Sequence, residues 1–199
     1  MQQSLGKHDA LEVVLQSYKD ISYPLKKKRI VLTGAPATGK TTLSLGLEAQ
    51  GHNVFHEQAR QIIQKSLENG SNVLPWKDLN RFTEVVWDLR NEQYELASLE
   101  TLNFYDRSIM DSYAYLLKGN AKTKAQWMSD MKTKTFDKIF ILPVWPDIHS
   151  LDKERMESLE DCIEVESFLY KAYQEMGYEL IQVPFGTVEE RLAFIHHAI

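Results

Sequence analysis

The chain has little cysteine: Cys162 is the only one among its 199 residues. A single thiol excludes an intrachain disulfide and the cysteine cluster of a structural zinc site. No apolar run approaches the roughly 20 residues that a helix needs to cross a bilayer, and no signal peptide opens the chain. These absences exclude a disulfide scaffold and an integral membrane protein. We therefore expect a cytoplasmic protein that has no membrane partner.

The sequence also lacks an excess of positive charge. Its formal net charge is -5, so general affinity for nucleic acid is not expected. One basic run, residues 26–29, leads into the first predicted strand. Such a run can be a nucleic-acid or targeting patch, or simply the solvated edge of a strand, and we favour the strand edge. The hydrophobic content of 43% and the chain length fit a single globular domain.

The most specific signal is a glycine-rich segment of the pattern G-x-x-x-x-G-K-[ST]. It lies between an apolar run at residues 29–33, typical of a buried strand, and the start of a helix at residues 43–47. Strand, loop and helix in this order predict a nucleotide-phosphate site, because backbone N–H groups and the helix N-terminus point at the anion. Lys40 is expected to reach the β- and γ-phosphates, and the Thr41 hydroxyl to bind Mg²⁺. The segment consists of Gly34, Ala35, Pro36, Ala37, Thr38, Gly39, Lys40, Thr41 and Thr42.

Strands and helices alternate along the rest of the chain, which predicts a parallel sheet covered on both faces. In such sheets, ligands bind beyond the carboxyl ends of the strands. Residues 1–25 are expected to form a helical extension, either docked on the domain or serving as a partner-binding arm, ahead of a P-loop domain at 26–199. Further strands are expected at residues 53–56, 101–105, 137–142 and 178–183, and helices at 58–67, 76–99, 108–117, 159–176 and 188–198.

Two acidic residues follow predicted strands directly. Asp106 stands where a Walker-B-type acid holds Mg²⁺, although it also suits the N-cap of the next helix. Glu57 is placed to accept the proton of an attacking hydroxyl or to hold an acceptor. Arg60, three residues further on, is expected to reach the acceptor or to pair with Glu57, and an ordinary surface Glu–Arg pair is the alternative.

The residue after Asp106 separates two kinds of chemistry. ATPases of the mechanical kind usually carry a second acid there to activate water, whereas this chain has Arg107. A cation does not polarise water but does clamp a phosphate or an oxyanion, which favours transfer to a bound acceptor over hydrolysis. Asp111 lies one helical turn beyond Arg107, and reading the acceptor's hydroxyls and being a plain surface acid remain equal alternatives for it.

Two loops complete the predicted site. Residues 146–156 are expected to form a lid that excludes water, with Arg155 as the cation that neutralises charge on the moving phosphoryl group. Phe185 and Gly186 follow the last strand and are expected to contact the adenine ring. The base-reading motif N-K-x-D of G-proteins is missing after the fourth strand, where residues 142–145 read Leu-Pro-Val-Trp, so guanine specificity is not expected.

At these residues the chain resembles a known group. It is similar to the small P-loop ATPase and kinase family related to the ribosylnicotinamide kinase domain of NadR. The similarity lies in the phosphate loop at residues 34–42, the Glu57-x-x-Arg60 segment, residues 105–108, the lid with Arg155 and the tail at 177–191. Residues 106–108 are also similar to a motif of deoxyribonucleoside kinases. The resemblance implies an α/β three-layer P-loop NTPase fold, with a kinase-like sheet order of 2-3-1-4-5, and the cofactors ATP and Mg²⁺.

The residues favour a kinase that transfers the γ-phosphoryl group of ATP to a small hydroxyl acceptor, such as a nucleoside or a nicotinamide riboside-like compound. In this hypothesis Lys40, Thr41 and Asp106 hold Mg·ATP, Glu57 serves the acceptor, and Arg107 and Arg155 stabilise charge. The alternative is an ATP-binding or ATP-hydrolysing switch that acts through a protein partner. The sequence leaves open the acceptor's identity and whether the chain forms a homodimer.

Overall fold

The computed structural model describes residues 26–148 and 157–199. Five strands form one parallel sheet in the order β2-β3-β1-β4-β5, which confirms the predicted order. They are β1 (Arg29–Thr33), β2 (Asn53–Phe55), β3 (Asn103–Asp106), β4 (Lys138–Ile141) and β5 (Leu180–Gln182). The two predicted features at residues 1–25 and at Arg155 lie outside the described residues.

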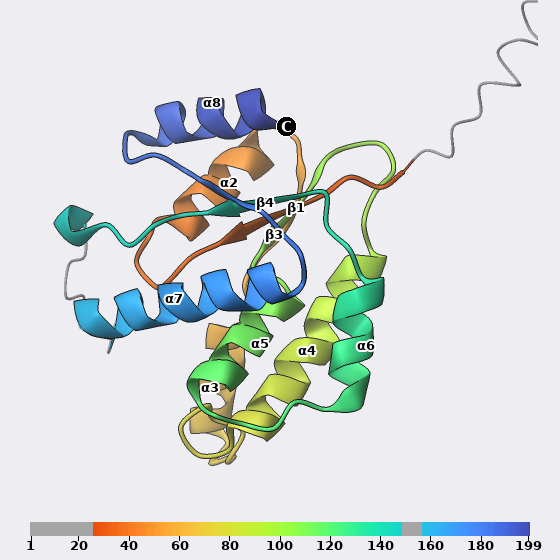
Figure 1. The fold of residues 1–199 in the computed structure, drawn as a ribbon, viewed down its shortest axis with the longest axis vertical. Helices are drawn as coiled ribbons and strands as arrows, with labels where there is room; N and C mark the ends of the chain where they lie inside the picture. Colours follow the sequence, from red (N-terminus) through yellow and green to blue (C-terminus); the bar gives the residue numbers. More distant parts are fainter. Residues whose placement is uncertain (1–25, 149–156) are drawn as a thin grey trace, which may run out of the picture.

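Helices cover both faces of the sheet, as predicted (Figure 1). On one face lie α2 (Lys40–Ala49) and α8 (Val188–Ala198). The other face carries α4 (Leu79–Glu95), α5 (Ile109–Lys118), α6 (Ala125–Thr133) and α7 (Leu159–Glu175), with α3 (Ala59–Glu68) beside them. Among the described residues, no helix combines the length and the apolar character needed to cross a bilayer.

The alternation of side chains along the strands explains the two layers. Ile30 and Leu32 of β1 pack with α2 and α8, whereas Val31 between them packs with the helices of the other face. A strand sends successive side chains to opposite faces, so a strand buried on both sides must be apolar throughout. The interior strand β3 is likewise buried at all four residues, with apolar Phe104 and Tyr105 between the polar ends Asn103 and Asp106.

The helices differ from the sequence-based prediction in two places. No element was predicted between residues 118 and 136, yet α6 lies there, anchored because the Trp127 ring stacks on Trp87 and Asp130 accepts a hydrogen bond from the Trp87 indole at 2.8 Å. These contacts come from α4, so α6 depends on tertiary packing that its own sequence does not show. The long helix was also expected to continue to residue 99, but it ends at Glu95, and Leu96 after it is 70% exposed.

The basic run at the start of β1 is a paired strand edge. Lys26 forms an ion pair with Asp137 at 2.6 Å, and Lys27 donates a hydrogen bond to the Glu95 carbonyl at 3.1 Å. Both contacts lie at the edge of the sheet where β1 begins, opposite the phosphate loop. The two lysine side chains are thus paired with groups of the same domain, which agrees with the strand-edge interpretation.

Candidate active site

The parallel register brings the predicted site residues to one edge of the sheet. Leu32 pairs with Asp106, and Phe55 pairs with Tyr105, so the ends of β1, β2 and β3 lie level. The phosphate loop leaves β1 at this edge, and Glu57 follows β2 there. The carboxyl ends of parallel strands form the ligand-binding edge of open α/β sheets, and the predicted site residues lie at this edge.

Two glycines allow the phosphate loop to take its shape. Gly34 has a φ of 144°, and a Cβ there would collide with the carbonyl oxygen of Leu142. Gly39 has a φ of 89°, and its Cβ would lie 2.8 Å from a guanidinium nitrogen of Arg191. Among the described residues, no side chain caps the start of α2, which begins at Lys40. Its first N–H groups are therefore available to an anion.

Lys40 lies inside the phosphate loop. Its ammonium donates hydrogen bonds to the Ala35 carbonyl at 2.6 Å and to the Thr38 hydroxyl at 3.3 Å. Burial, and next the charge of Arg107, lower the pKa of Lys40 to about 7, against the opposing effect of the nearby carboxylates of Asp106, Asp111 and Glu57. The ammonium and three carboxylates thus lie within electrostatic reach of one another.

The lowered pKa of Lys40 leads to a prediction for nucleotide binding. Above pH 7 the free protein holds Lys40 largely uncharged, and a triphosphate favours the ammonium, so binding must take up a proton. We expect the ATP dissociation constant to rise by up to about tenfold per pH unit between pH 7 and pH 9. Titration calorimetry at pH 8, in two buffers of different ionisation enthalpy, measures the uptake. Binding heats that do not depend on the buffer would contradict the prediction.

Asp106 has the properties of a metal-binding carboxylate. It ends β3, is 4% exposed, and its Oδ1 has no hydrogen-bond partner among the described residues. Burial raises the pKa of Asp106, while the charges of Lys40 and Arg107 oppose that rise. A buried carboxylate oxygen that accepts no hydrogen bond is stabilised better by a bound cation than by the protein interior. The alternative that Asp106 caps the next helix is wrong, since Ser108 is the N-cap of α5.

The surroundings of Asp106 fit Mg²⁺ rather than a metal held by protein alone. Among the described residues, no group of three or more His, Cys, Asp or Glu is placed to hold a metal ion. Mg²⁺ usually takes one or two carboxylates together with phosphates and waters, and keeps several of those waters. Thr41 and Thr42 are exposed in the first turn of α2, on the same loop as Lys40.

Arg107 is held in one position by two carboxylates. It forms ion pairs with Glu57 through Nε and with Asp111 through Nη1, the latter at 3.3 Å. Burial alone would lower the pKa of Arg107, but the Tyr115 hydroxyl and the carboxylates around it raise that pKa above its usual range, so the guanidinium stays charged. Its φ of 77° lies in the left-handed region that non-glycine residues rarely adopt. This strained turn aims a charged, immobilised side chain at the edge of the sheet.

Arg90 is a site residue that the sequence analysis missed. From α4 it donates to Glu57 Oε1 at 3.2 Å and to the Ser112 hydroxyl at 2.6 Å. Glu57 therefore lies between two arginines. A signal was present in the sequence, because Arg90 continues the buried stripe of Thr83, Val86 and Trp87 at helical spacing. A charged residue on the apolar face of a helix calls for a partner inside the protein.

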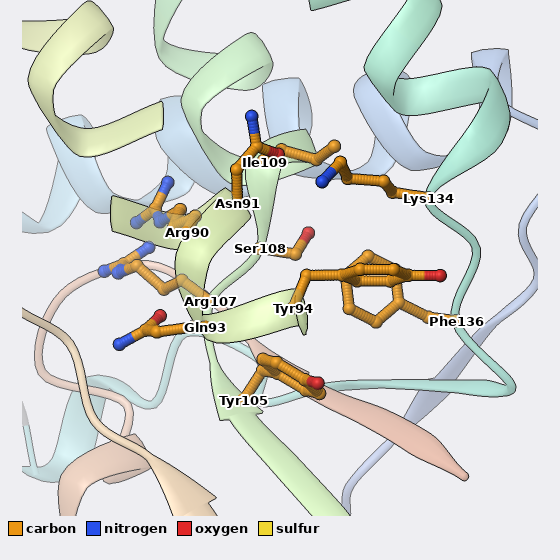
Figure 2. A pocket seen from close by; sticks show the side chains of 10 residues that line it. All are labelled: Arg90, Asn91, Gln93, Tyr94, Tyr105, Arg107, Ser108, Ile109, Lys134 and Phe136. Carbon is orange, nitrogen blue, oxygen red and sulfur yellow. The ribbon is translucent and has the colours of Figure 1, made fainter. Parts of the chain in front are cut away.

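Two small, open pockets flank Arg90 and share Gln93. In the first, the nitrogen atoms of Arg90, Arg107 and Gln93 lie to one side and the rings of Tyr94 and Phe136 to the other (Figure 2). The second, named here the Glu57 pocket, has polar and apolar walls. It is lined by His56, Glu57, Gln58, Ala59, Ile62, Val86, Leu89, Arg90, Gln93 and Asp106.

Asp111 and Arg60, two predicted contacts of the acceptor, have surroundings in the structure that differ from those predicted. Asp111 is fully buried, which rules out the surface-acid alternative, and its oxygens accept hydrogen bonds only from protein groups among the described residues. An acid with no lone pair to spare does not read an acceptor, so its assignment as a substrate contact is corrected to a support of Arg107. Arg60 is exposed on α3 and makes no ion pair within the described chain, since Glu57 pairs with Arg90 and Arg107 instead.

The loop after β5 forms an aromatic surface near the phosphate loop. Phe185 is 52% exposed and its ring stacks on Trp145, with ring centroids 4.9 Å apart. The guanidinium of Arg191 lies 5.8 Å from the centroid of the Trp145 ring. Both terminal nitrogens of Arg191 also donate to the Thr38 carbonyl at 3.2 Å, which ties this surface to the loop. Gly186, at a φ of 153°, adjoins Phe185.

Comparisons with known proteins agree with this fold. A family model described as an AAA domain matches residues 29–191. Deoxyadenosine kinase from M. mycoides, with dCMP and dCDP bound, is similar in structure at 14% identity, a TM-score of 0.61 and coverage of 85% of this chain and 97% of that chain. Thymidylate kinase from Candida albicans is similar at 16% identity, a TM-score of 0.62 and coverage of 87% and 91%.

A structure of NadR protein in complex with NR is similar at 15% identity and a TM-score of 0.67. The alignment covers 95% of this chain and 60% of that chain. A comparison with curated proteins found no match. At such identities the solved structures establish the fold, which is a P-loop NTPase fold of the kinase type, and they confirm the resemblance inferred from the motifs.

Proposed function

We propose that this chain, which belongs to the AAA domain family by a match over residues 29–191, is an ATP- and Mg²⁺-dependent kinase that phosphorylates a hydroxyl of a small molecule. The observation that carries the proposal is Arg107, a buried and charged guanidinium directly after Asp106 and beside Lys40. A water-activating acid would be needed there for efficient hydrolysis, whereas an arginine stabilises charge on a phosphoryl group in transit.

In this proposal the phosphate loop, residues 34–42, binds the triphosphate through its backbone N–H groups and Lys40. Thr41 and Asp106 hold Mg²⁺, which supplies charge neutralisation on the phosphates when it is bound. The exposed face of Phe185, together with Gly186, contacts the adenine ring. The link from Arg191 to Thr38 would then hold the base-binding surface and the phosphate loop in a fixed relation.

The Glu57 pocket is the proposed acceptor site. One wall is apolar, from Ile62, Val86 and Leu89, and suits a flat heterocycle, while Arg90 and Gln93 offer hydrogen-bond donors. The arginines bring no surplus positive charge, since Glu57 and Asp111 neutralise Arg90 and Arg107. A pocket without surplus cations suits an acceptor that carries no phosphate, such as a nucleoside or a nicotinamide riboside-like compound.

Glu57 would receive the acceptor hydroxyl through one particular oxygen. Its Oε1 accepts from Arg90 at 3.2 Å and from the Ala59 amide at 3.3 Å, so both of its lone pairs are used. Its Oε2 contacts Arg107 alone among the described residues and keeps one lone pair. That oxygen is available to orient the attacking hydroxyl and to take its proton, next to the guanidinium that stabilises the phosphoryl group.

The names of the similar structures support an acceptor of this class. A deoxyadenosine kinase, a thymidylate kinase and a NadR protein crystallised with NR share the fold. All three names refer to nucleosides, nucleotides or NR. The proposal extends that theme to this chain, with the neutralised Glu57 pocket as the reason for placing the acceptor among unphosphorylated compounds.

ADP release from Mg·ATP, measured with and without a panel of nucleosides, nicotinamide riboside and small sugars, tests the proposal. We expect release to rise by about a hundredfold or more with one member of the panel, because a positioned hydroxyl reacts far faster than free water. Mass spectrometry of that acceptor should show one added phosphoryl group. Slow release that no acceptor changes would instead favour the switch hypothesis, in which the chain binds or hydrolyses ATP and acts on a protein partner.

A further inference from the structure

Asp111 is the centre of a buried network that has no part in the site described so far except through Arg107. Its Oδ1 accepts from the Thr33 hydroxyl at 2.7 Å and from Arg107 at 3.3 Å. Its Oδ2 accepts from the Ser108 amide at 2.9 Å and from the Tyr173 hydroxyl at 2.6 Å. A carboxylate has about four acceptor positions, and all four are filled by protein groups.

The four donors come from three separate parts of the fold. Thr33 is the last residue of β1, directly before the phosphate loop, while Arg107 and Ser108 form the turn after β3. Tyr173 comes from α7, which packs along α5 (Figure 1). The carboxylate therefore joins the strand that enters the phosphate loop, the turn that carries the charged guanidinium, and a helix that lies outside both.

We propose that Tyr173 is a positioning residue for phosphoryl transfer, whose hydroxyl holds Asp111 so that Asp111 holds Arg107. This inference rests on the proposed kinase function. Without the Tyr173 donor, Oδ2 keeps the Ser108 amide alone, so fewer hydrogen bonds hold the carboxylate against rotation about its χ2 angle. A turn of that kind moves Oδ1 away from Arg107, whose other ion pair, to Glu57, leaves the far end of the guanidinium unsupported.

The surroundings of Tyr173 fit this role. The side chain is fully buried, and its oxygen lies 2.7 Å from the Ser108 hydroxyl, which donates to it when Tyr173 donates to Asp111. Burial, and next the Asp111 charge, raise the pKa of Tyr173 well above its ordinary value, so the hydroxyl keeps its proton. It is therefore a permanent donor, one whose removal leaves a buried charge with a missing partner.

The chain offers a matched control in the same pair of helices. Tyr113 of α5 donates to Glu175 of α7 at 2.8 Å, so Tyr113→Phe also removes one tyrosine hydroxyl bonded to a carboxylate between α5 and α7, away from Asp111. We expect Tyr173→Phe to lower kcat for acceptor-dependent transfer by about 10- to 100-fold, with the KM for ATP changed less than about twofold, because the guanidinium loses its alignment. Tyr113→Phe should leave kcat within about twofold.

A double-mutant cycle separates positioning from a general structural effect. If Tyr173 acts through Arg107, Tyr173→Phe should change kcat by less than about twofold when Arg107→Lys is already present. The second readout needs no activity: the NMR signal of the Arg107 Nε–H group, assigned by its loss in Arg107→Lys, should broaden and exchange faster with water in Tyr173→Phe, and stay unchanged in Tyr113→Phe.

The outcomes are distinct. Equal kcat values for the two phenylalanine variants, a kcat effect that persists in the Arg107→Lys background, or an unchanged Arg107 signal in Tyr173→Phe would each overturn the positioning role. Where the parent protein shows no acceptor-dependent transfer, the kinase proposal fails, and the Arg107 signal then decides the positioning role by itself. Should Tyr173→Phe fail to fold, Thr33→Val removes another donor to Asp111 and must weaken the same signal.

Discussion

Lys40→Met should lose ATP-dependent turnover by about a thousandfold or more while the protein remains as stable as the parent. The loss follows from removing the buried ammonium that the phosphate loop holds for the phosphates, a contribution comparable to that of a preorganised oxyanion donor. Stability should not fall, because burial lowers the pKa of Lys40 to about 7, which means that the folded state holds this charge at a cost. Steady-state ADP release and the thermal midpoint measure the two effects.

Lys28→Met is the matched control for this substitution. Lys28 is exposed next to the start of β1, at the edge of the sheet opposite the phosphate loop, so its loss should leave turnover within about twofold. Full activity in Lys40→Met would remove the phosphate loop from the site altogether. A drop in the thermal midpoint of more than about 5 °C would show instead that Lys40 supports the fold through its contacts with Ala35 and Thr38.

Arg107→Lys should reduce acceptor-dependent transfer by about 100- to 1,000-fold although the charge is kept. The guanidinium contacts Glu57 through Nε and Asp111 through Nη1, two carboxylates in different directions, and a single ammonium does not satisfy both. One carboxylate should then lack its partner, and the charge should no longer be fixed where the phosphoryl group passes. The effect belongs in kcat, with ATP affinity nearly unchanged, because the proposed role of Arg107 is exerted on the group in transit.

Arg81→Lys provides the comparison, since Arg81 lies on the same side of the sheet in α4 but is 59% exposed and pairs with Glu84 at the surface. Its kcat should match that of the parent. Equal kcat values for Arg107→Lys and the parent would mean that Arg107 supplies charge only, without direction. A loss confined to the KM for ATP would place Arg107 on the nucleotide instead of on the group that moves.

Lys40→Met and Arg107→Lys both change a site whose residues reduce the stability of the fold. Arg107 adopts a left-handed backbone at a φ of 77°, Asp106 buries an oxygen that has no partner among the described residues, and Lys40 is buried with a lowered pKa. Strain and unpaired polar groups of this kind persist where the surrounding structure fixes them and where function uses them. Their concentration at one edge of the sheet supports the proposed active site independently of the sequence motif.

The sequence alone predicted much of this edge. Residues 34–42 combine glycine spacing, a preceding apolar strand and a following helix, and local physics links those features, so the phosphate loop and its neighbours were found. The alternation of strands and helices predicted the parallel layers, and the position of Asp106 at a strand end predicted its place beside the loop. Glu57 and Arg107 were likewise placed at the edge, although nothing local indicated that they bind each other.

What the sequence determined is the set of features coded within one strand, one loop or one helix: the phosphate loop, the layers, and the acids at the strand ends. The tertiary structure alone decided the partners. It paired Glu57 with Arg90 and Arg107, where a neighbouring Arg60 had been expected, and it turned Asp111 inward onto Thr33 and Tyr173. These contacts join residues 33 to 78 positions apart. Helix and strand periodicity reports which face of an element is buried, whereas the buried partner of a charge depends on how distant elements pack.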